Sequence, residues 1–479
     1  MLRWPPWGLM LLLAGCGCRR GCAPEAAVEP AASMVMAPAS VPVPTAAATR
    51  APWRTDTVAE LFCINEAVSV PQRLVRGGTL QPADIAVMLE DDAQLAASVG
   101  ARMVRANSAN YPYISWHEWQ QRPQAQDRTD RYLALVQQAG LEPLVMIGPW
   151  PGNQTGNYTQ HYVPGDMAAY SAWVQRVVER YDGDGVDDAP GLLRPVRFWE
   201  VDNEPDLHNR VPPKGAKRQV DPSTFETPSE YAQVLLATAT AVRAAFPDAV
   251  VLNAGTFDTG RDSGRAYLEQ VFAVPGTLDA IDGLSIHAYF QEPTPERYLA
   301  ALDNAQAVAD GRPVFITETG APSELDGRSY VDERYHARML VFVYGEALAR
   351  GVERVCWHTL ADPPAGRSGP GPGGGFSSHS LHRTTGRPPQ QQREPKLAAA
   401  VFRRLVDLVG DVPVTSVEPA RIAGGRGVRV GDAGWLIYEG QDVSLPIDSG
   451  VIIDLISGDE TPWAGSVSAP ALVRPAVEG

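Results

Sequence analysis

The chain has 479 residues, a formal net charge of −15 at pH 7 and a hydrophobic share of 44%. This length allows two or three domains, and this share of apolar residues is ample for a sizeable core. The acidic balance argues against a nucleic-acid partner, and no basic run in the sequence contradicts that. We therefore expect a folded protein whose acidity mainly favours solubility.

The first residues predict export and lipid attachment. Arg3 supplies a minimal basic region, and Trp7 to Ala14 form an apolar stretch that is too short to span a bilayer. The segment Leu13-Ala14-Gly15-Cys16 resembles a bacterial lipobox, in which Cys16 would carry the lipid. An ordinary signal peptide with a chance cysteine is the alternative. The lipobox implies a cell-envelope lipoprotein of a bacterium, held at the outer membrane or cell surface.

Residues 1–16 are thus the expected signal peptide, and residues 17–52 have a different composition. They are rich in Ala, Pro and Val, and such a segment cannot bury a core. We interpret residues 17–52 as a tether. The membrane is then contacted only through the lipid anchor.

From residue 53 onward, strand-like and helix-like segments alternate. Strands are indicated by short apolar and β-branched runs, and helices by apolar residues at helical spacing. The expected strands cover 61–65, 101–106, 144–147, 196–201, 250–253, 281–288, 313–318 and 354–359. The expected helices cover 83–99, 129–139, 167–181, 229–246, 265–272, 295–310, 332–349 and 396–408.

This alternation predicts an α/β fold, a (β/α)8 TIM barrel over residues 53–409. An open doubly wound sheet is the alternative, and it is disfavoured because no glycine-rich nucleotide loop follows the first strand. The segment Asp362–Pro395 is rich in Gly and Pro and follows the last barrel strand. We expect it to be a long loop without secondary structure on the active-site face, with disorder over 363–374.

After Val409 the pattern changes to short strands between glycine-rich turns. The expected strands cover 427–430, 434–438, 443–447 and 451–456, with no helix among them. Residues 410–479 are therefore predicted to form a small antiparallel β-domain.

Two glutamates end two of the predicted barrel strands. Glu204 follows the run Val196 to Val201, and Pro205 stops that strand because it has no N–H to donate. Glu318 ends the apolar stretch that begins at Pro313. Two carboxyl groups at one end of a barrel suit general-acid and nucleophile chemistry, while two capping glutamates are the structural alternative.

Asn203-Glu204-Pro205, followed by Thr317-Glu318-Thr319-Gly320, resembles the retaining glycoside hydrolases of clan A. The resemblance covers residues 61–409 and is greatest to families 39 and 5, between which the motifs do not choose. It implies cleavage of O-glycosidic bonds in an oligo- or polysaccharide by double displacement. Glu204 would be the acid/base and Glu318 the nucleophile. The chain departs from the common Trp-Asn-Glu-Pro version at Asp202.

The resemblance also implies roles for two residues beside the glutamates. Arg105 would lie near Glu318 and keep it charged; a surface position, with Arg102 in that role, is the alternative. Asn203 would bond the sugar 2-hydroxyl.

Further residues at strands six and eight match the clan pattern. His287 would lie in the substrate site and Tyr289 would donate to the nucleophile, since alternation places both on one face. Trp357 would be the platform under the reacting sugar. Core packing of Trp357, with His358 facing the site, is the alternative. Asn65 and Glu66 end the first strand and are further substrate contacts, and Trp116, Trp119 and Trp150, in loops, are candidates for outer subsites.

Two cysteines lie outside the N-terminal leader, Cys63 on the first predicted strand and Cys356 on the eighth. These strands become neighbours when a barrel closes, so the two could pair in an oxidising compartment. We favour two buried thiols instead. No Cys or His cluster has zinc spacing, so we expect no metal and no cofactor.

The sequence therefore predicts a lipid-anchored retaining glycoside hydrolase. A non-catalytic glycan-binding lipoprotein on a barrel scaffold is one alternative, which the presence of both Glu204 and Glu318 argues against. A transglycosylase is another, because it differs only in the acceptor.

Overall fold

The computed structural model describes residues 53–65, 80–105, 114–121, 124–149, 163–206, 227–257, 259–290, 294–324, 331–362, 378–386, 390–420 and 422–476. Cys16, the predicted tether over 17–52 and the segment 363–374 lie outside these residues, so the predictions on them stay predictions. None of the helices in the described ranges is long and apolar enough to cross a membrane.

Eight parallel strands form the predicted barrel. Their order around the sheet is β6-β5-β4-β2-β1-β9-β8-β7, and a parallel bridge between Leu252 and Gly283 joins the two ends. The strands are β1 (Phe62–Asn65), β2 (Met103–Arg105), β4 (Glu142–Gly148), β5 (Phe198–Val201), β6 (Val250–Asn253), β7 (Leu284–His287), β8 (Val314–Thr319) and β9 (Arg354–His358). The (β/α)8 prediction is confirmed. One short strand, β3 (Ile114–Ser115), was not predicted and pairs with β4.

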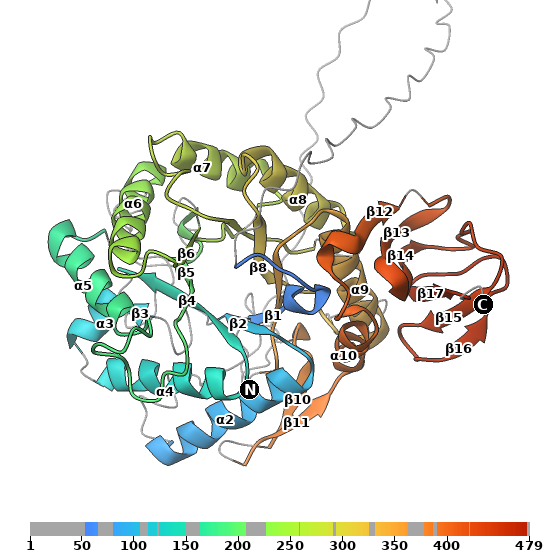
Figure 1. Ribbon diagram of the computed structural model, residues 1–479, viewed down its shortest axis with the longest axis horizontal. Helices are drawn as coiled ribbons and strands as arrows, with labels where there is room; N and C mark the ends of the chain where they lie inside the picture. The colour runs from blue at the N-terminus through green and yellow to red at the C-terminus, as the bar shows by residue number, and fades with distance from the viewer. Residues whose placement is uncertain are drawn as a thin grey trace, which may run out of the picture. The chain divides into compact units, whose positions relative to one another are not determined.

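Helices surround the strands on the outside of the barrel (Figure 1). They are α2 (Pro82–Ser98), α3 (Trp116–Gln121), α4 (Gln124–Gln138), α5 (Met167–Glu179), α6 (Pro228–Ala245), α7 (Asp262–Phe272), α8 (Glu296–Val308), α9 (Glu333–Ala349) and α10 (Leu397–Val409). Several begin at a side-chain cap, as at α6, where Thr227 and Glu230 form a capping box. Helix α3 was not predicted, because its residues were assigned to a loop.

The barrel interior has an apolar lower layer. Alternate strand residues form one hydrophobic cluster there: Cys63, Met103, Leu144, Phe198, Val250, Leu252, Phe315 and Cys356, with Trp53 packed against it. Two positions further along, five of these strands carry a polar residue that faces inward: Asn65, Arg105, Glu200, Thr317 and His358. This change of character within one barrel places the polar layer at the carboxyl ends of the strands.

Cys63 and Cys356 form a disulfide in the lower layer. The preference for two buried thiols was therefore wrong. Strands β1 and β9 pair in parallel with Cys63 directly opposite Cys356, and the two Cα atoms are 4.1 Å apart. The pairing depends on the strand register, which the sequence does not display.

The C-terminal region forms one antiparallel sheet, as predicted. Its order is β12-β13-β14-β17-β15-β16. The strands are β12 (Val417–Ala420), β13 (Gly425–Val430), β14 (Gly434–Gly440), β15 (Gly450–Asp454), β16 (Glu460–Pro462) and β17 (Ala471–Pro475). The prediction of a strand over 443–447 was wrong. Val443 makes a single bridge to Val467, and Pro446 has no N–H for a ladder.

This sheet packs against α9. Arg426 donates to the buried Glu346 carboxylate at 2.6 Å, and the Tyr438 ring lies edge-on to Phe342 at 5.7 Å. Gly345 is needed at this contact, since a Cβ there would lie 2.2 Å from the Tyr438 ring.

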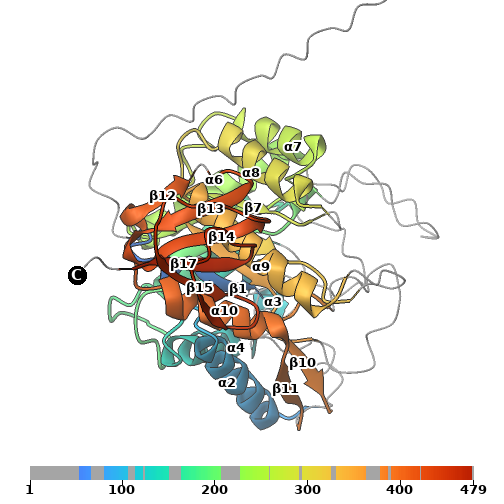
Figure 2. The same ribbon diagram turned by 90° about the vertical axis from the view of Figure 1, so that its right-hand side faces the viewer.

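Part of the segment expected to lack structure forms a hairpin, β10 (His382–Thr385) and β11 (Gln392–Pro395). That prediction was wrong for these residues. The hairpin lies beside α2 (Figure 2), where Arg393 pairs with the buried Asp92 at 3.0 Å. At its end the buried Lys396 donates to Asp362 at 3.0 Å. These tertiary ion pairs, rather than local propensity, order the segment.

Candidate active site

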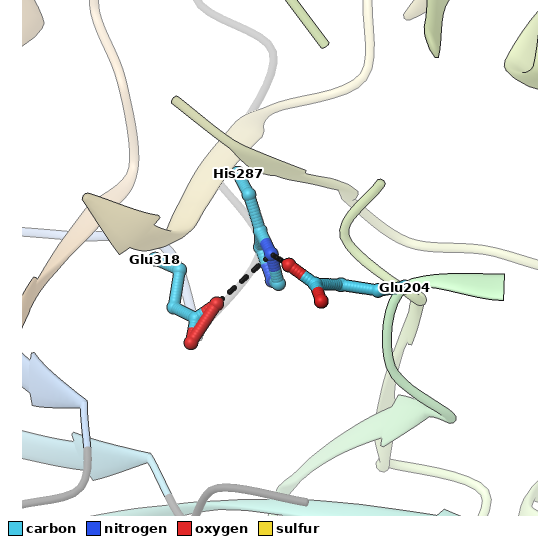
Figure 3. Close-up of side chains that lie close together, drawn as sticks. All are labelled: Glu204, His287 and Glu318. Carbon is cyan, nitrogen blue, oxygen red and sulfur yellow. Dashed lines mark hydrogen bonds and ion pairs between the residues drawn. The ribbon is translucent and has the colours of Figure 1, made fainter. Parts of the chain in front are cut away.

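The two predicted glutamates meet at the carboxyl end of the barrel, on either side of His287 (Figure 3). Glu318 is the fifth residue of β8, His287 ends β7, and Glu204 follows β5. One ligand atom from each of the three residues lies within 4.8 Å of the others. The pair that the motifs indicated is therefore assembled in space.

His287 forms the link between the two carboxylates. Its Nδ1 lies 2.8 Å from Glu204 Oε1 and 3.0 Å from Glu318 Oε2, and its ring is fully buried. Burial by itself lowers the pKa of His287, but the two carboxylates outweigh it and raise that pKa to about 9. An Nδ1–H is present in the protonated ring and in one neutral tautomer. In that tautomer Nε2 can accept from Arg105 Nη2, 3.5 Å away.

The surroundings of Glu318 favour its ionised form. Asn65 Nδ2 donates to Glu318 Oε1 at 2.8 Å, and Arg105 Nη1 and His358 Nδ1 lie 4.0 and 3.9 Å from the same oxygen. Burial acts to raise the pKa of Glu318, but His287, His358 and Arg105 together hold that pKa well below its usual range. An ionised carboxylate is what a nucleophile requires.

The pKa of Glu204 is shifted in the opposite direction to that of Glu318. Burial raises its pKa, Glu318 raises it further, and His287 and Arg105 act in the opposite sense. The net shift is upward, towards the protonated form that a general acid needs. Two neighbouring carboxyl groups with pKa values moved apart are a recognised mark of an acid–base assignment.

The backbone around Glu204 is unusual. Glu204 and Asp202 have φ values of 48° and 71°, in the left-handed region that non-glycine residues rarely adopt. The Glu204 N–H donates to the Gly255 carbonyl at 3.0 Å, and the Asp202 N–H donates to the Ile147 carbonyl at 3.0 Å. Conformations of this kind cost about 1–3 kcal/mol each and occur preferentially at functional sites. They turn the chain out of β5 and direct the Glu204 carboxyl group towards His287.

Glu200 is a site residue that sequence reasoning missed. It is fully buried in β5 and accepts from Arg105 Nε. Its other oxygen accepts from Ser285 Oγ at 2.7 Å, Thr317 Oγ1 at 3.0 Å and the Gly255 N–H at 3.2 Å. An acidic residue within the apolar run Phe198–Val201 was the available signal, because a buried charge requires a partner.

Arg105 occupies the centre of this polar layer, and the surface alternative is excluded by its complete burial. Besides Glu200, it donates to Asn65 Oδ1 at 3.0 Å and Asn203 Oδ1 at 2.7 Å. Its distance of 4.0 Å from Glu318 makes Glu200, not Glu318, its main partner. Asn203 is thus held beside Arg105.

Trp357 and His358 are consecutive in β9, so their side chains point to opposite sides of the barrel wall. The Trp357 side chain is fully buried, its indole N–H donates to the His379 carbonyl at 2.9 Å, and its ring packs against His336 of α9. This position does not fit the predicted sugar platform and corresponds to the core-packing alternative. His358 faces the site, where its Nδ1 is 3.0 Å from Asn65 Nδ2. The Tyr289 ring lies edge-on to His358, with centroids 6.4 Å apart.

The candidates for outer subsites lie elsewhere. Trp116 and Trp119 are on helix α3 rather than in a loop, and Trp116 packs edge-on against Tyr170 of α5. Trp150 and Glu66 lie outside the described residues.

Glu204, His287 and Glu318 are close enough to hold a metal ion together. However, the imidazole already bonds to both carboxylates, and the Arg105 guanidinium supplies positive charge beside Glu318. These residues balance one another's charge without an ion. The absence of a metal cofactor stays a prediction.

Comparison with known proteins supports a glycoside hydrolase at the level of the class. A model of glycoside hydrolase family 44 matches residues 119–260, which include Glu204 but not Glu318. The match covers less than half of the chain, so we do not assign the chain to that family or to families 39 and 5. A comparison with curated protein sequences finds no match.

Two solved structures share the fold. One is a family 39 glycoside hydrolase from Bacteroides cellulosilyticus WH2, with a TM-score of 0.50 and 15% identity over 87% of this chain and 80% of that chain. The other is a glucosidase from Croceicoccus marinus, with a TM-score of 0.50 and 16% identity over 88% of this chain and 82% of that chain. At such identity the likeness shows the fold alone.

Proposed function

We propose that the protein is a retaining glycoside hydrolase with Glu204 as acid/base and Glu318 as nucleophile. The observation that carries this proposal is the separation of the two carboxyl groups, with oxygens within 4.8 Å of each other. Retaining enzymes hold their carboxyl groups about 5–5.5 Å apart, whereas inverting enzymes need about 6.5–9.5 Å to admit a water. The opposite pKa shifts of Glu204 and Glu318 agree with the two roles.

The reaction would proceed in two displacements. In the first, the Glu204 carboxylic acid protonates the glycosidic oxygen while the Glu318 carboxylate attacks the anomeric carbon, which gives a covalent glycosyl-enzyme and releases the leaving-group alcohol. In the second, the Glu204 carboxylate takes a proton from water, the water oxygen attacks the anomeric carbon, and Glu318 is released. Both displacements invert the anomeric centre, so the configuration is retained.

Neighbouring residues would hold these groups in place. Arg105 donates to Asn203 Oδ1, so the Asn203 Nδ2 is the atom that can donate to a sugar 2-hydroxyl. Asn65 fixes one oxygen of Glu318, and His287 bonds the other. With both oxygens oriented, the nucleophile needs little rearrangement to reach the anomeric carbon.

The substrate we propose is an oligo- or polysaccharide, and the location the cell envelope of a bacterium. The disulfide Cys63–Cys356 supports export, because structural disulfides persist in oxidising compartments. Attachment through Cys16 would be tested by metabolic labelling with a radioactive fatty acid. Loss of label in Cys16→Ala is expected, and undiminished label would exclude this anchor.

Chemical rescue tests the two roles separately. The chain is assayed on a panel of aryl β-glycosides and polysaccharides beside Glu204→Ala and Glu318→Gly. We expect azide to restore turnover of activated aryl glycosides in both, giving the glycosyl azide of retained configuration from Glu204→Ala and of inverted configuration from Glu318→Gly. NMR of the first-formed sugar from the parent should show retention, and an inverted anomer would overturn the mechanism. Binding without turnover in the parent would favour the non-catalytic alternative.

A further inference from the structure

The side chain of Asn65 has three hydrogen-bonding neighbours beside the proposed nucleophile. Asn65 ends β1 and is fully buried. Arg105 Nη1 donates to its Oδ1 at 3.0 Å, while its Nδ2 lies 2.8 Å from Glu318 Oε1 and 3.0 Å from His358 Nδ1. All three separations are ordinary hydrogen-bond distances.

The chemistry of these neighbours fixes the orientation of the Asn65 amide. A guanidinium group can only donate, and an ionised carboxylate can only accept. The opposite orientation would set the NH2 group against the Arg105 donor and the amide oxygen against the Glu318 carboxylate. The Asn65 Nδ2 therefore donates one of its two hydrogens to Glu318, and the second hydrogen is left for His358.

This second hydrogen determines which ring nitrogen of His358 carries a proton. Because His358 Nδ1 faces a donor, it must accept, and the ring is then neutral with its proton on Nε2. Burial lowers the pKa of His358 to about 4, with Glu318 acting in the opposite sense and Arg105 and His287 in the same sense as burial. A ring that is neutral at neutral pH agrees with an accepting Nδ1.

The fold keeps His358 beside Asn65. Strands β1 and β9 pair in parallel with these two residues directly opposite each other. Two positions earlier in the same strands, the disulfide Cys63–Cys356 joins β1 to β9 covalently. The His358 ring also lies edge-on to the Tyr289 ring. Contacts of this kind hold a side chain in one rotamer, as the support of a reactive group requires.

We propose that His358 is a positioning residue for Glu318. By accepting the second Asn65 hydrogen, the neutral imidazole holds the Asn65 amide in the plane in which its other hydrogen points at Glu318 Oε1. Without this acceptor the amide can turn, and the carboxylate loses one of the two bonds that orient it. The inference rests on the proposed function, in which Glu318 is the nucleophile, and it adds a residue that acts on Glu318 through Asn65.

The first test separates the Nδ1 acceptor from the rest of the ring. The probes are 2,4-dinitrophenyl β-glucoside, β-xyloside and β-mannoside, whose leaving group needs no proton, so the first displacement depends on Glu318. His358→Phe keeps a planar ring beside Tyr289 but removes the acceptor, and kcat/KM should fall by about 10- to 100-fold. His358→Asn places an amide oxygen near the position of Nδ1 and should keep most of the parent's activity. An equal loss in both variants would overturn the proposal.

The second test asks whether His358 acts through Asn65. Asn65→Ala is compared with the double change Asn65→Ala/His358→Phe on the same glycosides, and melting temperatures identify any variant that does not fold. We expect His358→Phe to add no further loss once the Asn65 amide is absent, because residues that act as one unit are not additive. Losses that multiply would overturn the proposal, since His358 would then act by another route.

The third test needs no turnover, so it separates failure of this inference from failure of the hydrolase proposal. In protein labelled with 15N-histidine, the ring nitrogen shifts of His358 at pH 7 should show an unprotonated Nδ1 and a protonated Nε2. The signals are assigned by their disappearance in His358→Asn. A protonated Nδ1 would overturn the inference even in an active enzyme. The expected tautomer in a parent without turnover would contradict the hydrolase proposal and not the bond between Asn65 and His358.

Discussion

Replacement of Glu200 by Gln tests the buried charge network beneath Glu318, the proposed nucleophile. Glu200 and Arg105 are both fully buried, and the four donors on Glu200 come from Arg105, Ser285, Thr317 and Gly255. If the NH2 group of the glutamine takes the place of Oε2, it faces the Arg105 Nε–H, which is also a donor. If it takes the place of Oε1, it faces the Gly255 N–H, another donor. Either orientation leaves a buried donor without an acceptor, and Arg105 loses its main counter-charge.

Removal of one partner from a buried ion pair typically costs about 3–5 kcal/mol, so we expect a loss of that order in the free energy of unfolding. Denaturant unfolding followed by tryptophan fluorescence measures it. Glu142→Gln is the matched control: Glu142 also lies on a barrel strand and pairs with Arg194, but at 3.4 Å with both side chains partly exposed. That change should cost about 0–1 kcal/mol. Equal stability of the two variants would refute the view that the Arg105–Glu200 pair supports the site.

Three further predictions concern the same layers of the barrel. In Gly255→Ala the added Cβ would lie 2.2 Å from His287 Cδ2, so kcat/KM on aryl glycosides should fall by about 100-fold, while Gly165→Ala, with no atom within 4 Å, should be silent. The double change Cys63→Ala/Cys356→Ala removes a disulfide whose two residues are 293 positions apart in the sequence. The loss of loop-closure entropy limits the stabilisation by this disulfide to about 5.7 kcal/mol. Denaturant unfolding should show a loss of about 2–5 kcal/mol in the free energy of unfolding. The pKa of His287 in the folded protein, about 9, lies above the ordinary value, so its contribution to stability is present below about pH 6.5 and is lost as the pH rises through 9. Melting temperatures should fall over that interval in the parent more steeply than in His287→Asn, and parallel curves would contradict the assignment.

The barrel strands were predictable because each βα unit repeats the same contrast of short apolar run and amphipathic helix. Glu204 and Glu318 were predictable for a related reason, since each follows or ends such a run. The features that were missed depend on contacts between distant segments. The disulfide needs the register of β1 against β9, and the hairpin β10–β11 is held by Arg393 on Asp92 of α2.

Glu200 and Trp357 show a different limit. Both lie in strands whose residues are buried on both faces, so hydrophobicity does not reveal which side chains point into the barrel. Glu200 points inward, where it meets Arg105, and Trp357 points outward, where it meets His336 of α9. The inward direction can be found by counting in steps of two along each strand. Cys63 leads to Asn65, and Cys356 leads to His358, the residue that faces the site.

The contacts of Arg105 explain how Glu318 can stay ionised without a close guanidinium partner. A carboxylate bonded at close range by a guanidinium would be ionised, but its lone pairs would be occupied by the fork of donors. Here the Arg105 Nε–H donates to Glu200, and the Arg105 guanidinium remains 4.0 Å from Glu318. At that distance its charge still lowers the pKa of Glu318. Asn65 and His287 each form a hydrogen bond to one oxygen of Glu318. The buried Glu200 thus holds the Arg105 guanidinium away from Glu318, and the close donors to Glu318 are the neutral Asn65 amide and His287.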